Sequence, residues 1–597
     1  MTRTPLRPLA RVLEARRKGE NPDAIEKENR RLRREDMRDT ARRRAEGRLL
    51  VLCVFFICGF LAIGGRMALL AASEPVEPRA AAAGNAIVAQ RADIVDRNGR
   101  LLATNLPTFA LYAQPPNMID RIGTAKKLAE IFPDMDEEEL IKDFTGPRKF
   151  LWIKKKLSPE QRQAVHDIGD PGLLFGPREM RLYPNGRLAA HVLGGASFGR
   201  EGVSSAEVIG VAGIEKAMDD WLRDPANGGT PLQLSIDTTV QHTMRQVLEG
   251  GMRLMNAKGA AGILMDIHTG EIVSMVSLPD FDPNDRPRPL TEGDAGDSPL
   301  FNRAVQGVYE LGSTFKIFTA AQAMELGQVN PDTMVDADAP MKWGRFTIRE
   351  FQNKNYGPLL SVTDVIVESS NVGTAKMALN IGGARQKAFL DKLGVFEPTP
   401  VELIEAPGAK PLVPPNWSEI VTITASYGHG FSSSPLHLAT AYASLLNGGL
   451  RVEPTLLRRS PDWQPGPRIV RPEVSAASAE MLRAVVERGT ASFGKVPGYE
   501  VGGKTGTANK PLKNGRGYHD DKNINTFAAV FPASAPEYVL VVSLDEASDN
   551  TGTKPRRTAG WTAVPVSAEV IRRVAPLLGL RPAIEPQLAS AVEVSAN

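Results

Sequence analysis

The feature that most constrains this chain is a long apolar run near its N-terminus. Residues 49–65 (LLVLCVFFICGFLAIGG) carry no charge, and after Arg66 the apolar run resumes and continues to Ala72. At about 1.5 Å of rise per residue, a helix over residues 49–72 spans about 36 Å, which crosses a hydrocarbon core of roughly 30 Å with some tilt. Arg66 lies near one end, where its long side chain reaches the interface. Residues 49–72 are therefore predicted to form a transmembrane anchor.

The flanks of this run set its orientation. A cleaved signal peptide is the alternative, but such a peptide has a short basic region and an apolar core of about 7–15 residues. Here both the leader and the apolar run are longer, which favours an uncleaved anchor. Arg and Lys crowd residues 1–48, whereas residues 73–86 (SEPVEPRAAAAGNA) hold a single Arg. The positive-inside rule then predicts a single-pass protein with a cytoplasmic N-terminus and the rest of the chain exported.

Composition excludes several function classes. The basic arm 1–48 has too few apolar residues to build a core, so a solvated helix or a disordered arm is expected. The net charge of the 597 residues is only +3, and the arm lacks aromatic residues, so no nucleic-acid partner is expected. The two cysteines, Cys53 and Cys58, both fall in the predicted span. The exported part therefore has no disulfide and no Cys-rich metal site.

Sequence patterns divide the exported part into two domains. We expect a linker at 73–86, a first domain at 87–230, a second at 231–577 and a tail at 578–597. A turn at Asp96–Gly99 predicts a hairpin in the first domain. In the second domain a helix is predicted at Thr238–Leu254, followed by two strands. Further strands are predicted at residues 499–503, 526–531 and 538–544. An antiparallel sheet flanked by helices, a mixed α/β fold, follows from this pattern.

Three short motifs carry the chemistry. Ser313 and Lys316 are three residues apart, so on a helix they share one face and the lysine amine can reach the serine hydroxyl. A serine is a weak nucleophile until a base takes its proton, and a lysine serves as that base only when its pKa is lowered. The second motif, Ser369-Ser370-Asn371, lies 53 residues beyond Lys316, and the third, Lys504-Thr505-Gly506-Thr507, lies near the C-terminal end.

The order and spacing of these motifs match the active-site set of penicillin-binding proteins and serine β-lactamases. The chain resembles a class B penicillin-binding protein, a peptidoglycan D,D-transpeptidase, from about Arg91 to Arg572. Further matching segments are residues 91–103 (RADIVDRNGRLLA), 181–191 (RLYPNGRLAAH) and 210–222 (GVAGIEKAMDDWL), which form a pedestal that β-lactamases lack. The resemblance implies an elongated α+β pedestal before a penicillin-binding transpeptidase fold.

The subtype also follows from the resemblance. Tyr309-Glu310 before the first motif, SSNVG at 369–373 and PPNWSE at 414–419 resemble the cell-division (FtsI-like) type. Two alternatives stay open: an elongation-type class B transpeptidase, and a catalytically idle β-lactam-binding sensor or divisome scaffold. The intact residues Ser313, Lys316 and Lys504 argue against the idle scaffold.

Residue roles come from the resemblance, position by position. Ser313 is expected to attack the carbonyl between the last two D-alanines of a stem peptide, with Lys316 as the base. Ser369 is expected to relay a proton to the leaving amine, and Asn371 to hold the substrate amide. Lys504, Thr505, Gly506 and Thr507 are expected to bind the substrate near its terminal carboxylate. The backbone N–H groups of Ser313 and Thr507 are expected to form the oxyanion hole.

The resemblance also implies the setting of the reaction. The substrates are peptidoglycan stem peptides, with β-lactams as covalent inhibitors, and no cofactor or metal is expected. The partners are a SEDS-type glycosyltransferase (FtsW-like), other divisome proteins and the membrane. The location is the division site of the cytoplasmic (inner) membrane, with the catalytic domain in the periplasm.

Other candidate residues are expected to be structural or solvated. The seven histidines are scattered and lack metal-ligand spacing. The triplet His519-Asp520-Asp521 is expected to lie in a polar loop after the third motif.

Overall fold

The computed structural model describes residues 7–72, 91–198, 208–227, 229–512 and 517–583. The predicted linker 73–86 and most of the tail 578–597 lie outside these ranges. The described residues belong to two compact units, one within residues 1–88 and one within residues 89–597. Each is described by itself.

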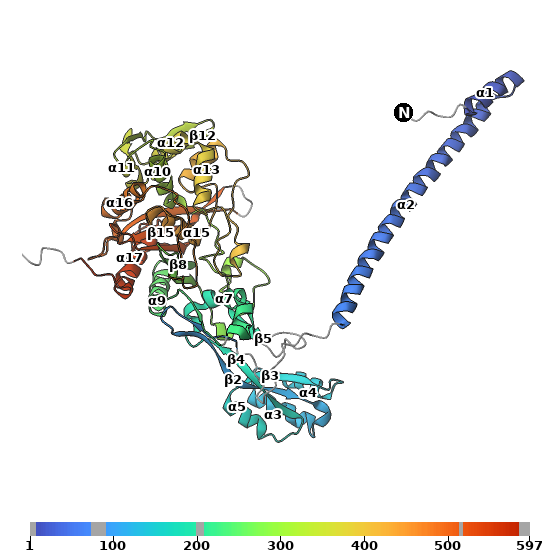
Figure 1. Ribbon diagram of the computed structural model, residues 1–597, viewed down its shortest axis with the longest axis horizontal. Coiled ribbons are helices and arrows are strands. Elements are labelled where there is room, and N and C mark those ends of the chain that lie inside the picture. Colours follow the sequence, from blue (N-terminus) through green and yellow to red (C-terminus); the bar gives the residue numbers. More distant parts are fainter. Residues whose placement is uncertain (1–6, 73–90, 199–207, 228, 513–516, 584–597) are drawn as a thin grey trace, which may run out of the picture. The chain divides into compact units, whose positions relative to one another are not determined.

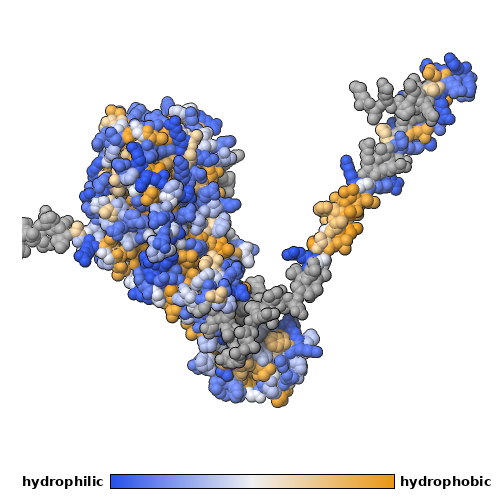
Figure 2. Space-filling view, viewed as in Figure 1, coloured by the Kyte–Doolittle hydropathy of each residue, from blue (hydrophilic) through white to orange (hydrophobic). Residues whose placement is uncertain are grey.

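The N-terminal unit consists of two helices, α1 (Arg7–Lys18) and α2 (Pro22–Ala72). The described part of the basic arm is therefore helical, with exposed ion pairs one turn apart such as Arg31–Glu35 and Arg42–Glu46, a spacing that places the two side chains side by side. Residues Glu46–Met67 of α2 are long enough and apolar enough to cross a membrane, by length and composition. Figure 2 shows these hydrophobic residues as one band along the helix.

The second unit begins with a sheet that the predicted hairpin starts. β1 (Ile94–Val95) pairs antiparallel with β2 (Leu101–Ala113), and Gly99 takes the left-handed conformation in the turn between them, which glycine adopts without steric cost. Asp96 closes the turn by accepting hydrogen bonds from the N–H groups of Asn98 and Arg100 at 2.8 and 2.9 Å. β2 also pairs with β3 (Leu151–Leu157) and β4 (Leu173–Leu182). The remaining elements of this part are α3 (Arg121–Ile131), α4 (Glu137–Thr145), α5 (Pro159–His166), α6 (Ala190–Leu193), β5 (Gly195–Phe198), β6 (Val208–Ala212), α7 (Gly213–Ala217) and α8 (Asp219–Arg223).

A buried ionic cluster joins the segments of this part. Arg91 donates from Nε to Glu215 Oε2 at 2.6 Å and from Nη1 to Asp219 Oδ1 at 2.7 Å. Arg181 Nε donates to the other Glu215 oxygen at 2.7 Å, and Tyr183 donates to that oxygen at 3.2 Å. The cluster thus joins Arg91, three residues before β1, to the end of β4 and to helices α7 and α8.

The larger part of this unit is built on a five-stranded antiparallel sheet in the order β14-β15-β16-β8-β9. Its strands are β8 (Gly259–Asp266), β9 (Ile272–Leu278), β14 (Gly502–Pro511), β15 (Tyr518–Phe531) and β16 (Tyr538–Asp545). β9 is buried throughout and β8 is buried up to its last residue, so helices cover both faces. α9 (Thr238–Leu254) and α17 (Ala563–Val574) pack on each other and on the sheet, and α15 (Pro435–Leu446) and α16 (Pro472–Arg488) do the same (Figure 1).

β7 (Leu232–Gln233) pairs in parallel with β1. The other helices and strands lie among the motifs. They are α10 (Lys316–Glu325), β10 (Met334–Asp336), β11 (Met341–Trp343), β12 (Phe346–Ile348), β13 (Leu359–Ser361), α11 (Val362–Val367), α12 (Asn371–Ile381), α13 (Gly383–Lys392) and α14 (Glu419–Ser426). The predicted mixed α/β fold with an antiparallel sheet flanked by helices is confirmed.

Some local expectations are corrected. The strand expected at residues 499–503 begins only at Gly502 and runs on through the third motif, because it pairs with β15 from Gly502 to Pro511. The triplet His519-Asp520-Asp521 lies inside β15 and not in a loop, since this strand extends far beyond the apolar part that the pattern predicted.

We predict that Arg91→Met lowers the stability of the protein by about 3–5 kcal/mol, because it leaves buried Glu215 and Asp219 without their cationic partner. The midpoint of thermal unfolding is the measurement. Arg148→Met is the matched control, since Arg148 forms an exposed ion pair with Asp143 at 3.2 Å. This control is expected to change stability by about 0.5 kcal/mol or less, as is usual for an exposed ion pair. Equal effects of the two substitutions would contradict the prediction.

Candidate active site

The first motif lies in a tight turn before a helix. Ser313 belongs to a 3₁₀ turn, η7 (Gly312–Phe315), and Lys316 is the first residue of α10. Ser313 is partly exposed, whereas Lys316 is completely buried. Gly428 lies against this turn, where a Cβ would come 2.1 Å from the carbonyl oxygen of Gly312. Ser313 and Lys316 thus lie one turn apart as predicted, with the serine in a 3₁₀ turn and the lysine at the start of the α-helix.

The second motif occupies the connection between α11 and α12. Ser369 has a φ of +62°, a left-handed conformation that is uncommon for a residue with a side chain. This conformation turns both its carbonyl and its hydroxyl toward Lys316: Nζ donates to Ser369 O, to Ser369 Oγ at 3.1 Å and to Asn371 Oδ1 at 2.7 Å. Among the described residues these are the hydrogen-bond acceptors of Lys316, so its amine is hydrogen-bonded to the second motif rather than to Ser313.

A buried carboxylate holds this second motif in place. Glu350 accepts from Ser370 Oγ at 2.6 Å, from the N–H of Asn371 at 2.7 Å and from the N–H of Val372 at 3.1 Å. These groups form the N-terminus of α12, where unpaired N–H groups and the helix dipole favour a negative charge. The sequence analysis missed Glu350, since it belongs to none of the three motifs.

The third motif lies on the edge strand β14. A Cβ at Gly506 would come 2.2 Å from the carbonyl oxygen of Leu311, so only glycine lets the strand approach the nucleophile turn this closely. Lys504, completely buried, donates from Nζ to Ser369 Oγ at 2.9 Å. Thr505 Oγ1 lies 2.9 Å from Thr490 Oγ1, and Thr507 Oγ1 accepts from the N–H of Ala559 at 3.0 Å.

Two buried lysines thus meet at one hydroxyl. Burial lowers the pKa of Lys316 to about 7, although the charge of Glu350 opposes the shift, because a buried site disfavours the charged form of an amine. Burial and the charge of Lys316 lower the pKa of Lys504 well below its usual value. A hydroxyl oxygen has two lone pairs and one proton, so Ser369 Oγ can accept from both amines and still donate. This arrangement can exchange a proton between a lysine and a group bound above Ser369.

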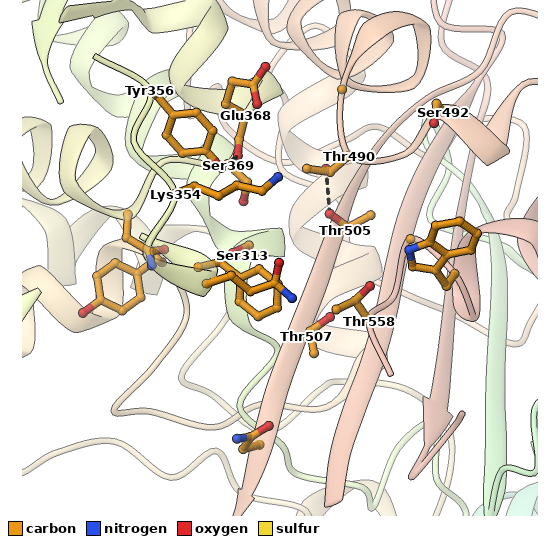
Figure 3. A pocket seen from close by; sticks show the side chains of 18 of the residues that line it. Ser313, Lys354, Tyr356, Glu368, Ser369, Thr490, Ser492, Thr505, Thr507 and Thr558 are labelled. Atoms are coloured by element: carbon orange, nitrogen blue, oxygen red, sulfur yellow. Dashed lines mark hydrogen bonds between the residues drawn. The ribbon is translucent and has the colours of Figure 1, made fainter. Parts of the chain in front are cut away.

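A pocket of about 680 Å³ opens in front of these groups. Its lining includes five of the predicted site residues: Ser313, Ser369, Asn371, Thr505 and Thr507. Lys316 and Lys504 lie behind the lining and contact it through Ser369. Figure 3 shows Ser313 and Ser369 facing Thr505 and Thr507 across the pocket, with Tyr356 and Lys354 beside Ser369. The pocket is lined by residues of all three motifs.

Other lining residues were not predicted. His429, expected to be structural or solvated, lines the pocket, and burial lowers its pKa. Tyr518, the residue before His519-Asp520-Asp521, also lines the pocket, and its hydroxyl donates a hydrogen bond to Glu310 at 3.1 Å. His429 lies between two glycines in the sequence SYGHG (residues 426–430), which could have marked it, whereas no sequence signal marked Tyr518. Among the described residues no group of three or more His, Cys, Asp or Glu side chains is arranged to hold a metal ion.

Comparisons with known proteins agree with this geometry. Residues 260–563 match the penicillin-binding protein transpeptidase domain, and residues 86–234 match the penicillin-binding protein dimerisation domain. The chain is 36% identical to the probable peptidoglycan D,D-transpeptidase FtsI of Caulobacter vibrioides, over 92% of this chain and 91% of that protein. It is 30% identical to the probable peptidoglycan D,D-transpeptidase PenA of Neisseria gonorrhoeae, over 85% of this chain and 88% of that protein.

A solved structure shares the fold. The crystal structure of penicillin-binding protein 3 from Mycobacterium tuberculosis, complexed with aztreonam, superimposes with a TM-score of 0.61 at 24% identity, over 83% of this chain and 98% of that chain. The fold, the three motifs and these matches define a penicillin-binding transpeptidase, and the chain belongs to that family. Within it the chain is FtsI-like, as Tyr309-Glu310 and the second motif indicated.

We predict that Glu350→Gln slows acylation of the protein by benzylpenicillin by about tenfold. The amide offers one acceptor oxygen where the carboxylate offers two, and its NH₂ group faces N–H donors, a loss of about 1.5–3 kcal/mol at the N-terminus of α12. Stopped-flow acylation is the measurement. Glu325→Gln is the control, because Glu325 pairs with Arg471 on an exposed surface at 3.4 Å. An unchanged acylation rate in Glu350→Gln would show that this carboxylate does not position the motif.

Proposed function

We propose that this protein cross-links peptidoglycan stem peptides at the division septum through a serine acyl-enzyme. One observation carries the proposal: a partly exposed serine lies one turn before a buried lysine of lowered pKa, and that lysine and Lys504 share the hydroxyl of Ser369. This arrangement supplies a nucleophile, a base and a proton relay in one pocket.

Acylation begins with Ser313. Its hydroxyl attacks the carbonyl between the last two D-alanines, and neutral Lys316 takes the proton. The negative charge on the carbonyl oxygen is stabilised by the N–H groups of Ser313 and Thr507. The backbone supports this assignment, because a Cβ on Gly312 would lie 3.2 Å from the Thr507 carbonyl oxygen, so the two segments approach closely. Ser369 then passes a proton to the leaving amine of D-alanine.

Substrate binding uses the opposite wall. The hydroxyls of Thr505 and Thr507 line the pocket next to buried Lys504, and we assign them to the terminal carboxylate of the substrate. Asn371 donates one N–H to the carbonyl of Arg349 at 2.8 Å. Because a side-chain amide carries two N–H donors, its second N–H is available for the substrate amide. β14 is an edge strand, so its outward backbone groups can pair with an extended peptide. β-Lactams, which mimic D-alanyl-D-alanine, acylate the same serine.

The second half-reaction joins two stem peptides. An amine of a neighbouring stem peptide attacks the Ser313 ester and forms the cross-link. The elongation-type alternative is disfavoured by Tyr309-Glu310 and Ser369-Ser370-Asn371. The idle scaffold is disfavoured by the intact residues Ser313, Lys316 and Lys504.

The proposed setting is the cytoplasmic (inner) membrane at the division site. Residues 49–72 anchor the chain, the basic arm 1–48 stays in the cytoplasm and the catalytic domain 231–577 lies in the periplasm on the pedestal 87–230. The partners are an FtsW-like SEDS glycosyltransferase and other divisome proteins, because a cross-linker must reach the strand that the polymerase has just made. The helical span and the relative's FtsI name support this setting.

We predict that the rate of acylation by benzylpenicillin rises with pH through about pH 7. The neutral fraction of Lys316 grows as the pH passes its pKa of about 7, and only the neutral amine accepts a proton. Acylation rates in buffers on both sides of this pH are the measurement, and the midpoint belongs to the coupled pair of lysines. Lys316→Arg, whose side chain keeps its proton, should be slow at every pH. A flat profile in the wild type would contradict the role of Lys316.

We predict that Ser313→Ala abolishes covalent labelling by a fluorescent penicillin while the fold stays intact, because only one partly exposed hydroxyl is removed. Gel fluorescence and the midpoint of thermal unfolding are the measurements. Ser548→Ala, outside the pocket, is the control and should label like the wild type. Labelling of Ser313→Ala at full stoichiometry would overturn the assignment of the nucleophile.

We predict that replacing residues 49–72 with an unrelated membrane span reduces recruitment to midcell and co-purification with the FtsW-like polymerase. The span contains Gly59, Gly64 and Gly65, and small residues allow close helix packing in lipid. Fluorescence microscopy and co-purification are the measurements, and penicillin binding in detergent is the control that should persist. Wild-type localisation of the exchanged protein would show that the span is only a tether.

A further inference from the structure

Two large aromatic side chains that belong to none of the three motifs are exposed inside the pocket. Phe493 is 52% exposed and Trp561 is 40% exposed, and both line the pocket. Their ring centroids lie 4.9 Å apart with an interplanar angle of 52°. Phe493 belongs to the turn η10 (Ser492–Gly494), and Trp561 lies just before α17. We call Phe493 and Trp561 the aromatic wall.

Neighbouring groups hold this wall in place before any ligand binds. The guanidinium of Arg556 lies 3.9 Å from the centroid of the Trp561 ring, a cation–π contact. Arg556 is itself anchored to Asp549 by two backbone hydrogen bonds of 2.9 Å and by an ion pair of 3.7 Å. A Cβ on Gly560 would come 2.9 Å from the carbonyl oxygen of Thr490, so the two segments that carry the wall pack directly on each other.

The wall lies at a defined end of the pocket. Phe493 comes three residues after Thr490, whose hydroxyl contacts Thr505 Oγ1 at 2.9 Å. Trp561 comes two residues after Ala559, whose N–H donates to Thr507 Oγ1 at 3.0 Å. The wall is therefore carried by the two segments that hydrogen-bond to the threonine hydroxyls that we assign to the substrate carboxylate. Figure 3 shows Thr490, Thr505 and Ser492 across the pocket from Tyr356 and Lys354.

The chemistry of the two half-reactions indicates what binds at the end of the pocket that carries the aromatic wall. In acylation the amide bond to the last D-alanine breaks, and its amine leaves with a proton. In deacylation a new amide bond forms, the ester bond to Ser313 Oγ breaks, the attacking amine loses a proton and Ser313 regains one. The attack of the acceptor amine on the ester resembles the reverse of the departure of the D-alanine amine. The acceptor amine therefore enters along the path by which the D-alanine amine left. The carbon chain of the acceptor therefore extends into the space that D-alanine and its carboxylate have vacated, beside the aromatic wall.

We propose that Phe493 and Trp561 form the binding surface for the acyl acceptor, a primary amine at the end of an aliphatic side chain of a second stem peptide. The proposal rests on the proposed function. Two apolar ring faces bury the methylene groups of such a chain, which stabilises the complex and directs the amine to the ester. Acylation by benzylpenicillin does not depend on the wall, because this reaction uses no acceptor and the β-lactam is bound by the three motifs.

The test separates acylation from deacylation in full-length protein in detergent. Acylation is measured with benzylpenicillin, which needs no acceptor. Deacylation is measured with a thioester analogue of acyl-D-alanyl-D-alanine, in the presence of Nα-acetyl-lysine amide or, as a short acceptor, glycinamide. The ratio of aminolysis to hydrolysis is the readout. The variants are Phe493→Ala and Trp561→Ala, and Phe351→Ala is the matched control, since Phe351 is 53% exposed and lines the same pocket next to the second motif.

In both wall variants we expect benzylpenicillin acylation within about twofold of wild type and aminolysis by the lysine derivative reduced by about tenfold relative to hydrolysis. Aminolysis by glycinamide and the Phe351→Ala control should stay near wild type. If Trp561→Ala fails to fold, Phe493→Ala alone decides the question.

An unchanged ratio in the wall variants would overturn the inference and leave the proposed function standing. An equal loss in Phe351→Ala, or a parallel loss of benzylpenicillin acylation in the wall variants, would also overturn it, because the wall would then act on the pocket as a whole or on the donor. A wild-type protein that is not acylated at all would overturn the proposed function and the inference together.

Discussion

Lys316 and Lys504 reach the same oxygen atom from two different elements of the fold. One amine comes from the first turn of α10 and the other from the edge strand β14, and both donate to Ser369 Oγ, at 3.1 and 2.9 Å. Two ammonium groups with no exposed surface repel each other, and water cannot screen them. Burial lowers both pKa values, so the pair releases protons more readily than exposed lysines would. The fold thus favours a neutral amine at Lys316 near neutral pH.

To bring the two amines to one hydroxyl, the backbone of Ser369 is strained and neighbouring groups hold it in place. Ser369 adopts a left-handed backbone conformation at φ +62°, which a serine accepts only when its surroundings hold it there. Glu350 supplies that support by taking three hydrogen bonds from Ser370, Asn371 and Val372. Gly506 supplies it from the other side, because the strand carrying Lys504 touches the nucleophile turn where a Cβ would collide. The three motifs therefore approach one another closely because Glu350 holds the second motif and because Gly506 has no side chain.

The sequence marked the motif residues that line the pocket, but not the residues that hold those motifs in place. The three motifs, the antiparallel sheet and the hairpin at Asp96–Gly99 followed from spacing and turn chemistry, which are local properties. Glu350 could not be found in this way, because its role arises from where the loop after β12 meets the N-terminus of α12. The expected start of β14 was too early, since pairing with β15 and not the apolar pattern sets its limits. The triplet His519-Asp520-Asp521 was expected in a loop because its residues are polar. In the structure these polar residues belong to the exposed first part of β15, which extends beyond the buried core.

Phe493 and Trp561 were not predicted either, because their role also depends on contacts between segments that are far apart in the sequence. Each is an isolated aromatic residue in the sequence, and only the packing of η10 against the segment before α17 brings them together. Their place in the pocket fits the two demands of the reaction. In the proposed mechanism the donor peptide is held by its carboxylate, which we assign to the hydroxyls of Thr505 and Thr507 and to buried Lys504. The ester that follows must meet an amine while water is kept away, since water competes for the same carbonyl. An apolar surface at the vacated end favours the methylene chain of an acceptor over water. The polar and apolar walls of one pocket can therefore serve the two successive half-reactions.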